Sequence, residues 1–323
     1  MIKGRVIKST GSWYNVRRLD NGEVVKCRIV GKFRLGNMNL TNPVAVGDVV
    51  EFAINDEELG MIKKIAPRVN YVARQSPRKL HDLHLLASNV DQAMLFVTIV
   101  ETHMKQGFID RFLLMTEPQD IPTIIVFNKS DLYDADDKAI FNDMKTIYEK
   151  IGYSVLLISA ITGEGLEDLK NILKDKITLV SGQSGVGKSS AVNAIQSQLI
   201  LKTGEISDYS GKGQHTTTFA EMFELDFGGS LIDTPGIKTL AFNNLQPMDV
   251  AHNFREFFIL SHKCKFGSSC MHRNEPGCAV KDALTDSEDS LTELGISELR
   301  YQNYLKILEE IEDINYWQRN KEA

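Results

Sequence analysis

The sequence predicts a multidomain fold in three parts: an N-terminal β-barrel over residues 1–68, a central α/β P-loop domain over 69–242, and a C-terminal, mostly α-helical domain over 243–323. Three observations support this division. Short strand patterns fill the first part, apolar runs alternate with helical patterns in the second, and three of the four cysteines lie within fifteen residues in the third. A chain of 323 residues also exceeds the usual size of one domain.

The first part has five short strand patterns separated by turn sequences such as "DNG" and "NDEELG". The strand patterns are "GRVIKS", "WYNVRRL", "EVVKCRI", "DVVEFAI" and "GMIKKI". Five strands of this kind predict a small barrel of the OB type, although SH3-like barrels give a similar pattern. Residues 1–90 contain 15 Lys and Arg against 8 Asp and Glu, on a chain with net charge −6. This basic excess indicates either a polyanionic partner such as RNA or a solvated charged surface.

The second part alternates buried-strand patterns with helical ones. The strands are expected at 93–100, 122–128, 153–159, 177–182 and 229–236, and the helices at 108–117, 137–152 and 165–175. Such alternation predicts a parallel sheet covered on both faces. Residues 67–83 are interpreted as a connector that carries proline and arginine.

A phosphate-binding loop follows the strand expected at 177–182. Gly182, Gly187, Lys188 and Ser189 satisfy the pattern GxxxxGK[ST], and a helical pattern begins directly afterwards. Glycines let backbone N–H groups wrap a phosphate, and the helix N-terminus favours its negative charge. Lys188 is expected to neutralise the β- and γ-phosphates and Ser189 to bind Mg²⁺. The remaining loop residues expected to contact the nucleotide are Gln183, Ser184, Gly185, Val186 and Ser190.

The sequence "DTPG" lies about 45 residues beyond this loop, at the end of an expected strand. Asp233 is the expected Mg²⁺-linked carboxylate, and the N–H of Gly236 is expected to contact the γ-phosphate. Between the two motifs, Thr216, Thr217 and Thr218 are candidates to close over Mg²⁺, and we favour Thr217.

The sequence "NKSD" contains Asn128, Lys129, Ser130 and Asp131 and follows an earlier strand. The Asp131 carboxylate can accept both N–H groups of the guanine edge, whereas adenine offers no such pair of donors. After the next strand, "SAITGEG" places Ser159 and Ala160 where the Ala160 N–H can reach the guanine carbonyl. These motifs favour GTP over ATP, and they disfavour the alternative of an ATPase or a small-molecule kinase.

The motif order is NKxD, SA, P-loop, Thr and DxxG, which is the usual GTPase cycle opened at a different loop. The ends of a small domain commonly lie close together, so such a circular permutation costs the fold little. With the barrel and the cysteines, the chain resembles the circularly permuted ribosome-assembly GTPases, specifically the family of ribosome small subunit-dependent GTPase A (RsgA). The resemblance implies a GTPase that binds the small (30S) ribosomal subunit and its rRNA late in maturation and is stimulated by it. A GTP-gated RNA-binding module with incidental hydrolysis is the alternative.

The residue that orients the attacking water needs separate identification. Ordinary small GTPases have a glutamine directly after DxxG, but this chain has Ile237 there, which cannot polarise water. His215, beside the three threonines, is the nearest polar candidate, and the resemblance also points to it. The competing interpretation is that His215 is an ordinary loop histidine.

Cys264, Cys270, His272 and Cys278 supply enough soft ligands for one tetrahedral Zn²⁺. His262 is a rival ligand, and similarity to the family favours His272. Four protein ligands leave no open position, so a structural site is expected. Cys27, isolated in an expected strand, is interpreted as a small core residue. The cofactors expected are therefore one zinc ion and Mg²⁺ with GTP.

The sequence contains no apolar run near the length that spans a bilayer and no signal-peptide pattern at its beginning. We therefore expect a cytoplasmic, monomeric protein with no membrane partner.

Overall fold

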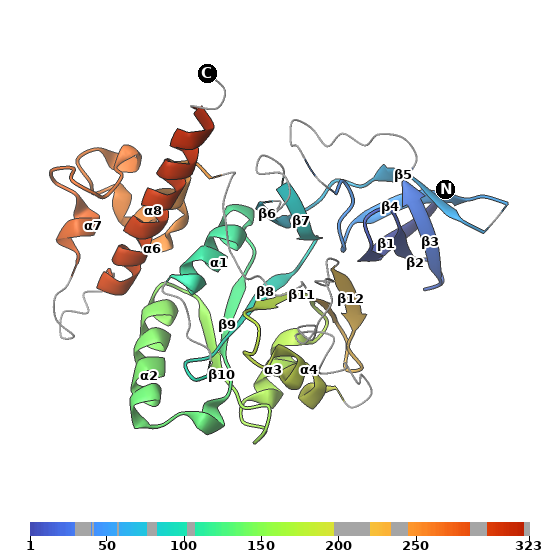
Figure 1. Ribbon diagram of the computed structural model, residues 1–323, viewed down its shortest axis with the longest axis horizontal. Coiled ribbons are helices and arrows are strands. Elements are labelled where there is room, and N and C mark those ends of the chain that lie inside the picture. The colour runs from blue at the N-terminus through green and yellow to red at the C-terminus, as the bar shows by residue number, and fades with distance from the viewer. Residues whose placement is uncertain are drawn as a thin grey trace.

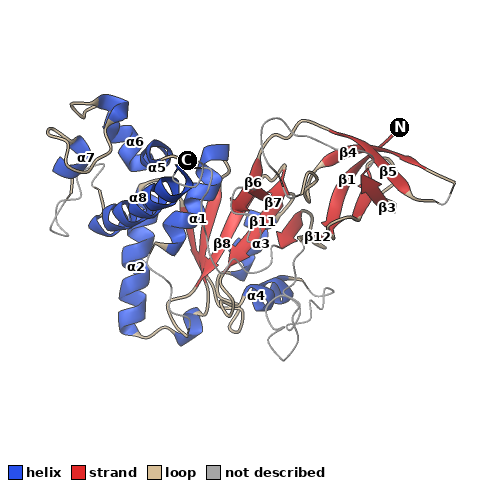
Figure 2. Ribbon diagram, turned by 45° about the horizontal axis from the view of Figure 1, so that its top comes forward, coloured by secondary structure: helices blue, strands red, loops and turns tan. Residues whose placement is uncertain are grey.

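The computed structural model describes residues 1–29, 40, 42–56, 58–75, 83–101, 107–196, 220–233, 245–284 and 296–319, with side chains described as far as residue 313. The three parts lie in a row along the long axis of the molecule (Figure 1). The barrel lies at one end, the α/β domain in the middle, and the C-terminal helices at the other end. Figure 2 shows the same division by secondary structure, with strands and no described helix in the barrel, and helices at the opposite end of the molecule.

The N-terminal part is a closed five-strand barrel, which confirms the prediction. Its strands are β1 (Ile2–Ser9), β2 (Tyr14–Arg18), β3 (Val24–Ile29), β4 (Val49–Ile54) and β5 (Gly60–Ile65). They pair in the order β1-β2-β3-β5-β4, and β4 pairs back to β1; only β3 and β5 are parallel. The interior includes Val16, Phe52 and Ile62. Cys27 is fully buried there, and a Cβ on Gly60 would lie 2.3 Å from its Sγ, so this cysteine fills the core.

The central part is the predicted parallel sheet. It contains β8 (Gln92–Val97), β9 (Thr123–Phe127), β10 (Ser154–Leu157), β11 (Ile177–Gly182) and β13 (Ser230–Asp233), in the order β10-β9-β8-β11-β13. Each of the five predicted strands is present. An additional strand, β12 (Glu221–Glu224), pairs antiparallel with β13 and was not predicted. One pairing of Glu221 with Lys8 joins this edge to the barrel, and the two side chains form an ion pair of 2.7 Å.

Successive residues of the central strands point to opposite faces of the sheet. Leu95 and Val97 of β8 belong to the core under α1 (Phe108–Thr116) and α2 (Ala135–Lys150). Met94 and Phe96 belong to the core under α3 (Leu166–Leu173) and α4 (Lys188–Ile195). Because both faces are covered, these strands are apolar at consecutive positions, as buried parallel strands are.

The segment interpreted as a connector contains a strand, so that interpretation was wrong for residues 71–75. β6 (Tyr71–Gln75) pairs antiparallel with β7 (Leu83–Ser88). The hairpin is fixed to the barrel through Asp48, whose carboxylate is fully buried. Arg68 lies 2.6 Å from both carboxylate oxygens of Asp48, and the Ser88 hydroxyl donates to Oδ1 at 2.6 Å.

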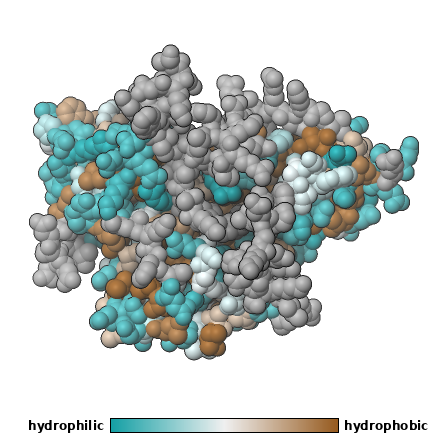
Figure 3. Space-filling view, viewed as in Figure 1, coloured by the Kyte–Doolittle hydropathy of each residue, from teal (hydrophilic) through white to brown (hydrophobic). Residues whose placement is uncertain are grey.

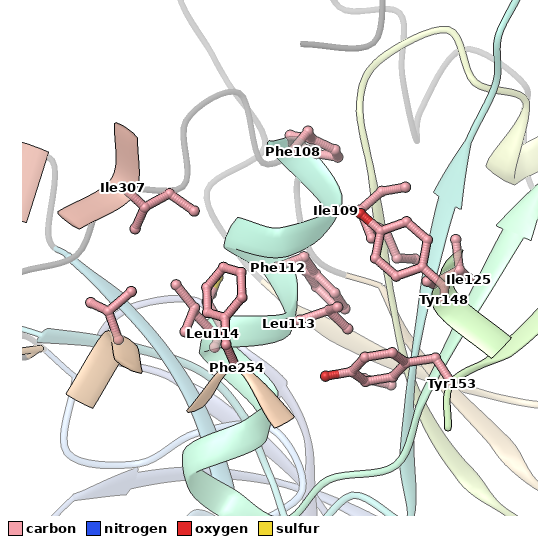
Figure 4. Packing of buried hydrophobic residues seen from close by; sticks show 14 of the residues in the cluster. Phe108, Ile109, Phe112, Leu113, Leu114, Ile125, Tyr148, Tyr153, Phe254 and Ile307 are labelled. Carbon is pink, nitrogen blue, oxygen red and sulfur yellow. The ribbon is translucent and has the colours of Figure 1, made fainter. Parts of the chain in front are cut away.

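The C-terminal part is helical, with α5 (Pro247–Asn253), α6 (Arg255–Ser261), α7 (Ala279–Asp282) and α8 (Glu298–Arg319). The inner face of α8 is apolar: Tyr301, Tyr304, Leu308 and Ile311 are buried, and Leu305 is partly buried. These helices share one core with α1: Phe254 and Ile307 lie on one side of α1, and Ile125, Tyr148 and Tyr153 on the other (Figure 4).

The described surface of the C-terminal helices is mostly hydrophilic in the view of Figure 3, and apolar residues appear there as separate spots. Among the described helices, none combines the length and hydropathy needed to cross a membrane.

Candidate nucleotide site and zinc site

Within the described part of the chain, the expected nucleotide-binding residues gather at one edge of the central sheet. The parallel strands β8, β9, β10, β11 and β13 all end there, and ligands of open α/β sheets bind beyond the carboxyl ends of the strands. The loops after β9, β10 and β11 carry "NKSD", "SAITGEG" and the phosphate-binding loop, and β13 ends at Asp233.

The phosphate-binding loop connects the end of β11 to the first residue of α4, Lys188. Gly185 and Gly187 have φ values of 85° and 84°, which favour glycine. At Gly182 a Cβ would lie 2.4 Å from the carbonyl oxygen of Phe96, so the close approach of the two strands excludes a side chain. The Lys188 ammonium donates to the carbonyls of Gly182 and Gln183, both at 3.1 Å.

Lys188 and Asp233 form the charged centre of this edge. Burial lowers the pKa of Lys188, and the Asp233 carboxylate opposes that shift. Burial raises the pKa of Asp233 to about 6, and Lys188 opposes it. Ser189, at the second position of α4, is 6% exposed. A buried ammonium, a carboxylate and a hydroxyl are the groups that hold a magnesium–phosphate unit in P-loop proteins, so the residues present fit Mg²⁺ bound with a nucleotide.

Asn128, the first residue of "NKSD", connects this motif to the phosphate-binding loop. Its Nδ2 donates to the Val186 carbonyl at 2.9 Å and to the Gly187 carbonyl at 3.3 Å. A Cβ on Gly187 would lie 2.4 Å from that Nδ2, so this contact also requires glycine. The structure thus brings together two motifs that lie 58 residues apart in the order opposite to that of ordinary GTPases.

The Asp131 carboxylate is positioned by the loop after β10. The Ser159 hydroxyl accepts from the backbone N–H groups of Ile161 and Thr162, at 3.2 and 3.0 Å. Its own hydrogen is therefore directed to Asp131 Oδ1, at 2.5 Å. Lys129 has φ 69°, and its ammonium lies 2.5 Å from a carboxylate oxygen of Glu101, a contact that was not predicted. Ala160 lies in the same loop as Ser159 and is half-buried.

Cys264, Cys270, His272 and Cys278 form a buried cluster whose ligand atoms all lie within 4.8 Å of one another. His272 Nδ1 is 3.4 Å from Cys278 Sγ and 3.7 Å from Cys264 Sγ. Bonds of about 2.0 Å to nitrogen and 2.3 Å to sulfur give tetrahedral edges of about 3.5 Å. The donor set therefore fits one structural Zn²⁺.

The backbone of the cluster is held by α8. Tyr301 and Tyr304 donate their hydroxyl hydrogens to the carbonyls of His272 and Met271, each at 2.7 Å. The rival ligand His262 is exposed, and its Nδ1 lies 2.5 Å from the Ile259 carbonyl. It is outside the cluster.

Several expected site residues lie outside the described part of the chain. These are Gly236, His215, Thr216, Thr217 and Thr218, together with Ile237.

Comparison with known proteins gives a consistent result for the whole chain. The family model of the RsgA GTPase matches residues 65–243, and that of the RsgA N-terminal domain matches residues 3–62. A protein of Phocaeicola vulgatus named small ribosomal subunit biogenesis GTPase RsgA is 47% identical over 98% of this chain and 99% of its own length. A protein of Flavobacterium psychrophilum with the same name is 48% identical over 95% of this chain and 93% of its own length.

Two solved structures have the same fold. YjeQ from Thermotoga maritima is 34% identical, with a TM-score of 0.73 over 96% of this chain and 98% of its own. YloQ, described as a circularly permuted GTPase, is 30% identical, with a TM-score of 0.69 over 97% of this chain and 96% of its own.

Proposed function

Because this chain belongs to the RsgA GTPase family and is therefore a GTP-hydrolysing enzyme, we propose that it binds the small (30S) ribosomal subunit and assists its late maturation. The names of the curated relatives support the subunit as the partner. The observation that best supports GTP hydrolysis is the contact of Asn128 with the phosphate-binding loop, because it brings the base-recognition motif and the phosphate-binding motif together. We place this activity in the cytoplasm and expect a monomer, which light scattering would test.

The proposed GTP site uses Asp131 for the guanine edge, with Ala160 at the guanine carbonyl. Lys188 and the backbone of the phosphate-binding loop hold the phosphates, and Gly236 contacts the γ-phosphate. Ser189, Asp233 and Thr217 would hold Mg²⁺, which supplies charge neutralisation at the phosphates when bound. The burial of Lys188 and Asp233 at one sheet edge supports this assignment.

His215 is the proposed group that orients water. Its support is chemical: Ile237 occupies the position of the usual glutamine, and an imidazole near neutral pH can orient or polarise water. Without a glutamine the free enzyme should turn over slowly, so binding of the subunit is expected to accelerate hydrolysis.

The proposed contact with rRNA involves the barrel. On the surface of β2 and β3, the Lys26 ammonium lies 4.3 Å and the Arg28 guanidinium 4.5 Å from the ring centroid of Trp13. An aromatic ring flanked by cations suits a nucleic-acid backbone with an unstacked base. Arg28→Ala should weaken rRNA binding and make it less dependent on salt. Equal affinity and salt dependence of the variant and wild type would contradict this part.

The central experiment measures GTP turnover with and without purified small subunits, for the wild type and for His215→Ala. We expect the subunit to stimulate the wild type, and His215→Ala to bind GTP and the subunit but to lose most of the stimulated rate. Binding of the subunit without stimulation would favour the GTP-gated RNA-binding module. Equal stimulation of both proteins would remove His215 from the mechanism.

A further inference from the structure

Besides Asp131, a second carboxylate lies at the "NKSD" motif. It belongs to Glu164, in the loop after β10, and contacts Ser130. Its Oε2 accepts a hydrogen bond of 2.5 Å from the hydroxyl of Ser130. Ser130 lies directly before Asp131, and only 7% of it is exposed. Glu164 is exposed, so apolar burial does not explain its position.

The backbone around Glu164 sets the direction of this side chain. The Glu164 carbonyl accepts from the Ser159 N–H at 3.0 Å, and the Ser130 N–H donates to the Ile158 carbonyl at 3.1 Å. The next residue, Gly165, has φ 67°, and a Cβ there would lie 2.3 Å from the Leu157 carbonyl oxygen. The chain must therefore turn immediately after Glu164, which keeps the carboxylate beside Ser130.

Two neighbouring residues of "NKSD" are consequently held by one loop. The Ser159 hydroxyl donates to the carboxylate of Asp131. The Glu164 carboxylate accepts from the hydroxyl of Ser130. Asp131 is exposed, so packing alone does not fix its orientation. An acceptor that discriminates guanine from adenine must be held in a defined direction, because selectivity depends on both of its hydrogen bonds.

We propose that Glu164 is a specificity-determining positioning residue, which holds Ser130 and thereby orients Asp131 toward the guanine edge. This inference rests on the guanine site proposed above. A hydrogen bond to a charged acceptor at a partly exposed position corresponds to about a 5- to 10-fold change in affinity when it is lost.

The test is a set of dissociation constants for GDP, IDP and ADP, measured for the wild type, Glu164→Ala, Ser130→Ala and the double variant. IDP lacks the exocyclic amine that would donate a hydrogen bond to Asp131. The difference between GDP and IDP affinity therefore measures how well that carboxylate is oriented. Glu164→Ala should weaken GDP binding about 5- to 10-fold and IDP binding less, which lowers the GDP/IDP preference. Ser130→Ala should do the same, and the double variant should be no weaker than the stronger single effect.

Two further variants separate positioning from folding. Glu164→Gln keeps an acceptor oxygen and should recover most of the preference. Glu167→Ala removes a nearby carboxylate in the first turn of α3, which forms an ion pair with Lys170 at 3.8 Å, and should leave all three constants unchanged. Additive single effects, or an unchanged GDP/IDP ratio in Glu164→Ala, would overturn the proposal for Glu164. A wild type without preference for GDP over ADP would instead overturn the guanine site itself.

Discussion

Arg300 of α8 forms a buried ion pair with Asp110 of α1, and the same guanidinium lies 2.5 Å from Glu256 of α6. Each of the three residues is at most 2% exposed. Burial alone lowers the pKa of Arg300, but the Glu256 and Asp110 carboxylates outweigh it and raise the pKa well above its usual value. One charged group therefore joins the zinc-binding helices to the GTPase domain, and α1 is the shared element.

Replacement of Arg300 should destabilise this junction strongly. Arg300→Ala leaves two carboxylates buried without their cation, which typically costs about 3–5 kcal/mol. Urea unfolding should show this loss, and hydrogen exchange should increase in α1 and α6. Arg111→Ala is the matched control, since Arg111 pairs with the half-exposed Glu310 and should cost at most about 1 kcal/mol. Similar losses for both variants would show that the buried pair is not what joins the two domains.

Asn128→Ala should weaken nucleotide binding, because it removes the hydrogen bonds that connect "NKSD" to the phosphate-binding loop. The Val186 and Gly187 carbonyls lose their donor, and a net loss of about 1–2 kcal/mol corresponds to roughly 5- to 30-fold weaker GDP binding. Calorimetric titration of both proteins measures this. Asn142→Ala, at an exposed position of α2, should bind GDP like the wild type. Unchanged affinity of Asn128→Ala would mean that the loops hold their positions without this side chain.

The alternation of apolar strands and helices predicted the central sheet, because both faces of its strands are buried and the pattern is local. The same reasoning missed β12 and the hairpin of β6 and β7. β12 is a four-residue strand at the sheet edge, whose place depends on pairing with β13. β6 lies in a segment rich in arginine, and its partner β7 begins eight residues after it ends. Neither pairing leaves a periodic pattern in the sequence.

The ligands of the candidate sites were predictable because their chemistry depends on short motifs. The residues that position those ligands were not. Glu164 and Glu101 were not identified because their contacts with Ser130 and Lys129 join different loops. Arg300 reads as a surface residue of an amphipathic helix, and only the packing of α8 against α1 shows that it is buried.

The zinc site should be lost on replacement of one ligand, together with the order of the surrounding segment. Cys270→Ser should reduce the zinc content from one ion per chain to near zero and lower the melting temperature, because binding energy of a structural zinc contributes to folding. Metal analysis and thermal unfolding measure the two effects. Cys27→Ala should also lower stability, through the barrel core, but keep one zinc ion. Retention of zinc by Cys270→Ser would argue against this ligand set.

Asp233→Asn should stabilise the nucleotide-free protein. Burial raises the pKa of Asp233 from an ordinary value of 3.8 to about 6, so the folded state holds this proton more tightly than the unfolded state does. The resulting stability is complete below about pH 4, is lost as the pH rises through 6, and stays lost at neutral pH. The cost at pH 7.5 is about 3 kcal/mol, which Asp233→Asn should largely recover. Denaturant unfolding between pH 4 and 7.5 should therefore show a smaller decline in the free energy of unfolding for Asp233→Asn than for the wild type.

The control variant is Asp226→Asn, at an exposed turn of the same hairpin, and its free energy of unfolding should follow that of the wild type. Parallel pH profiles for wild type and Asp233→Asn would show that the buried carboxylate carries no such cost. The expected result would mean that the site keeps a destabilising charge, which Lys188 alone does not neutralise.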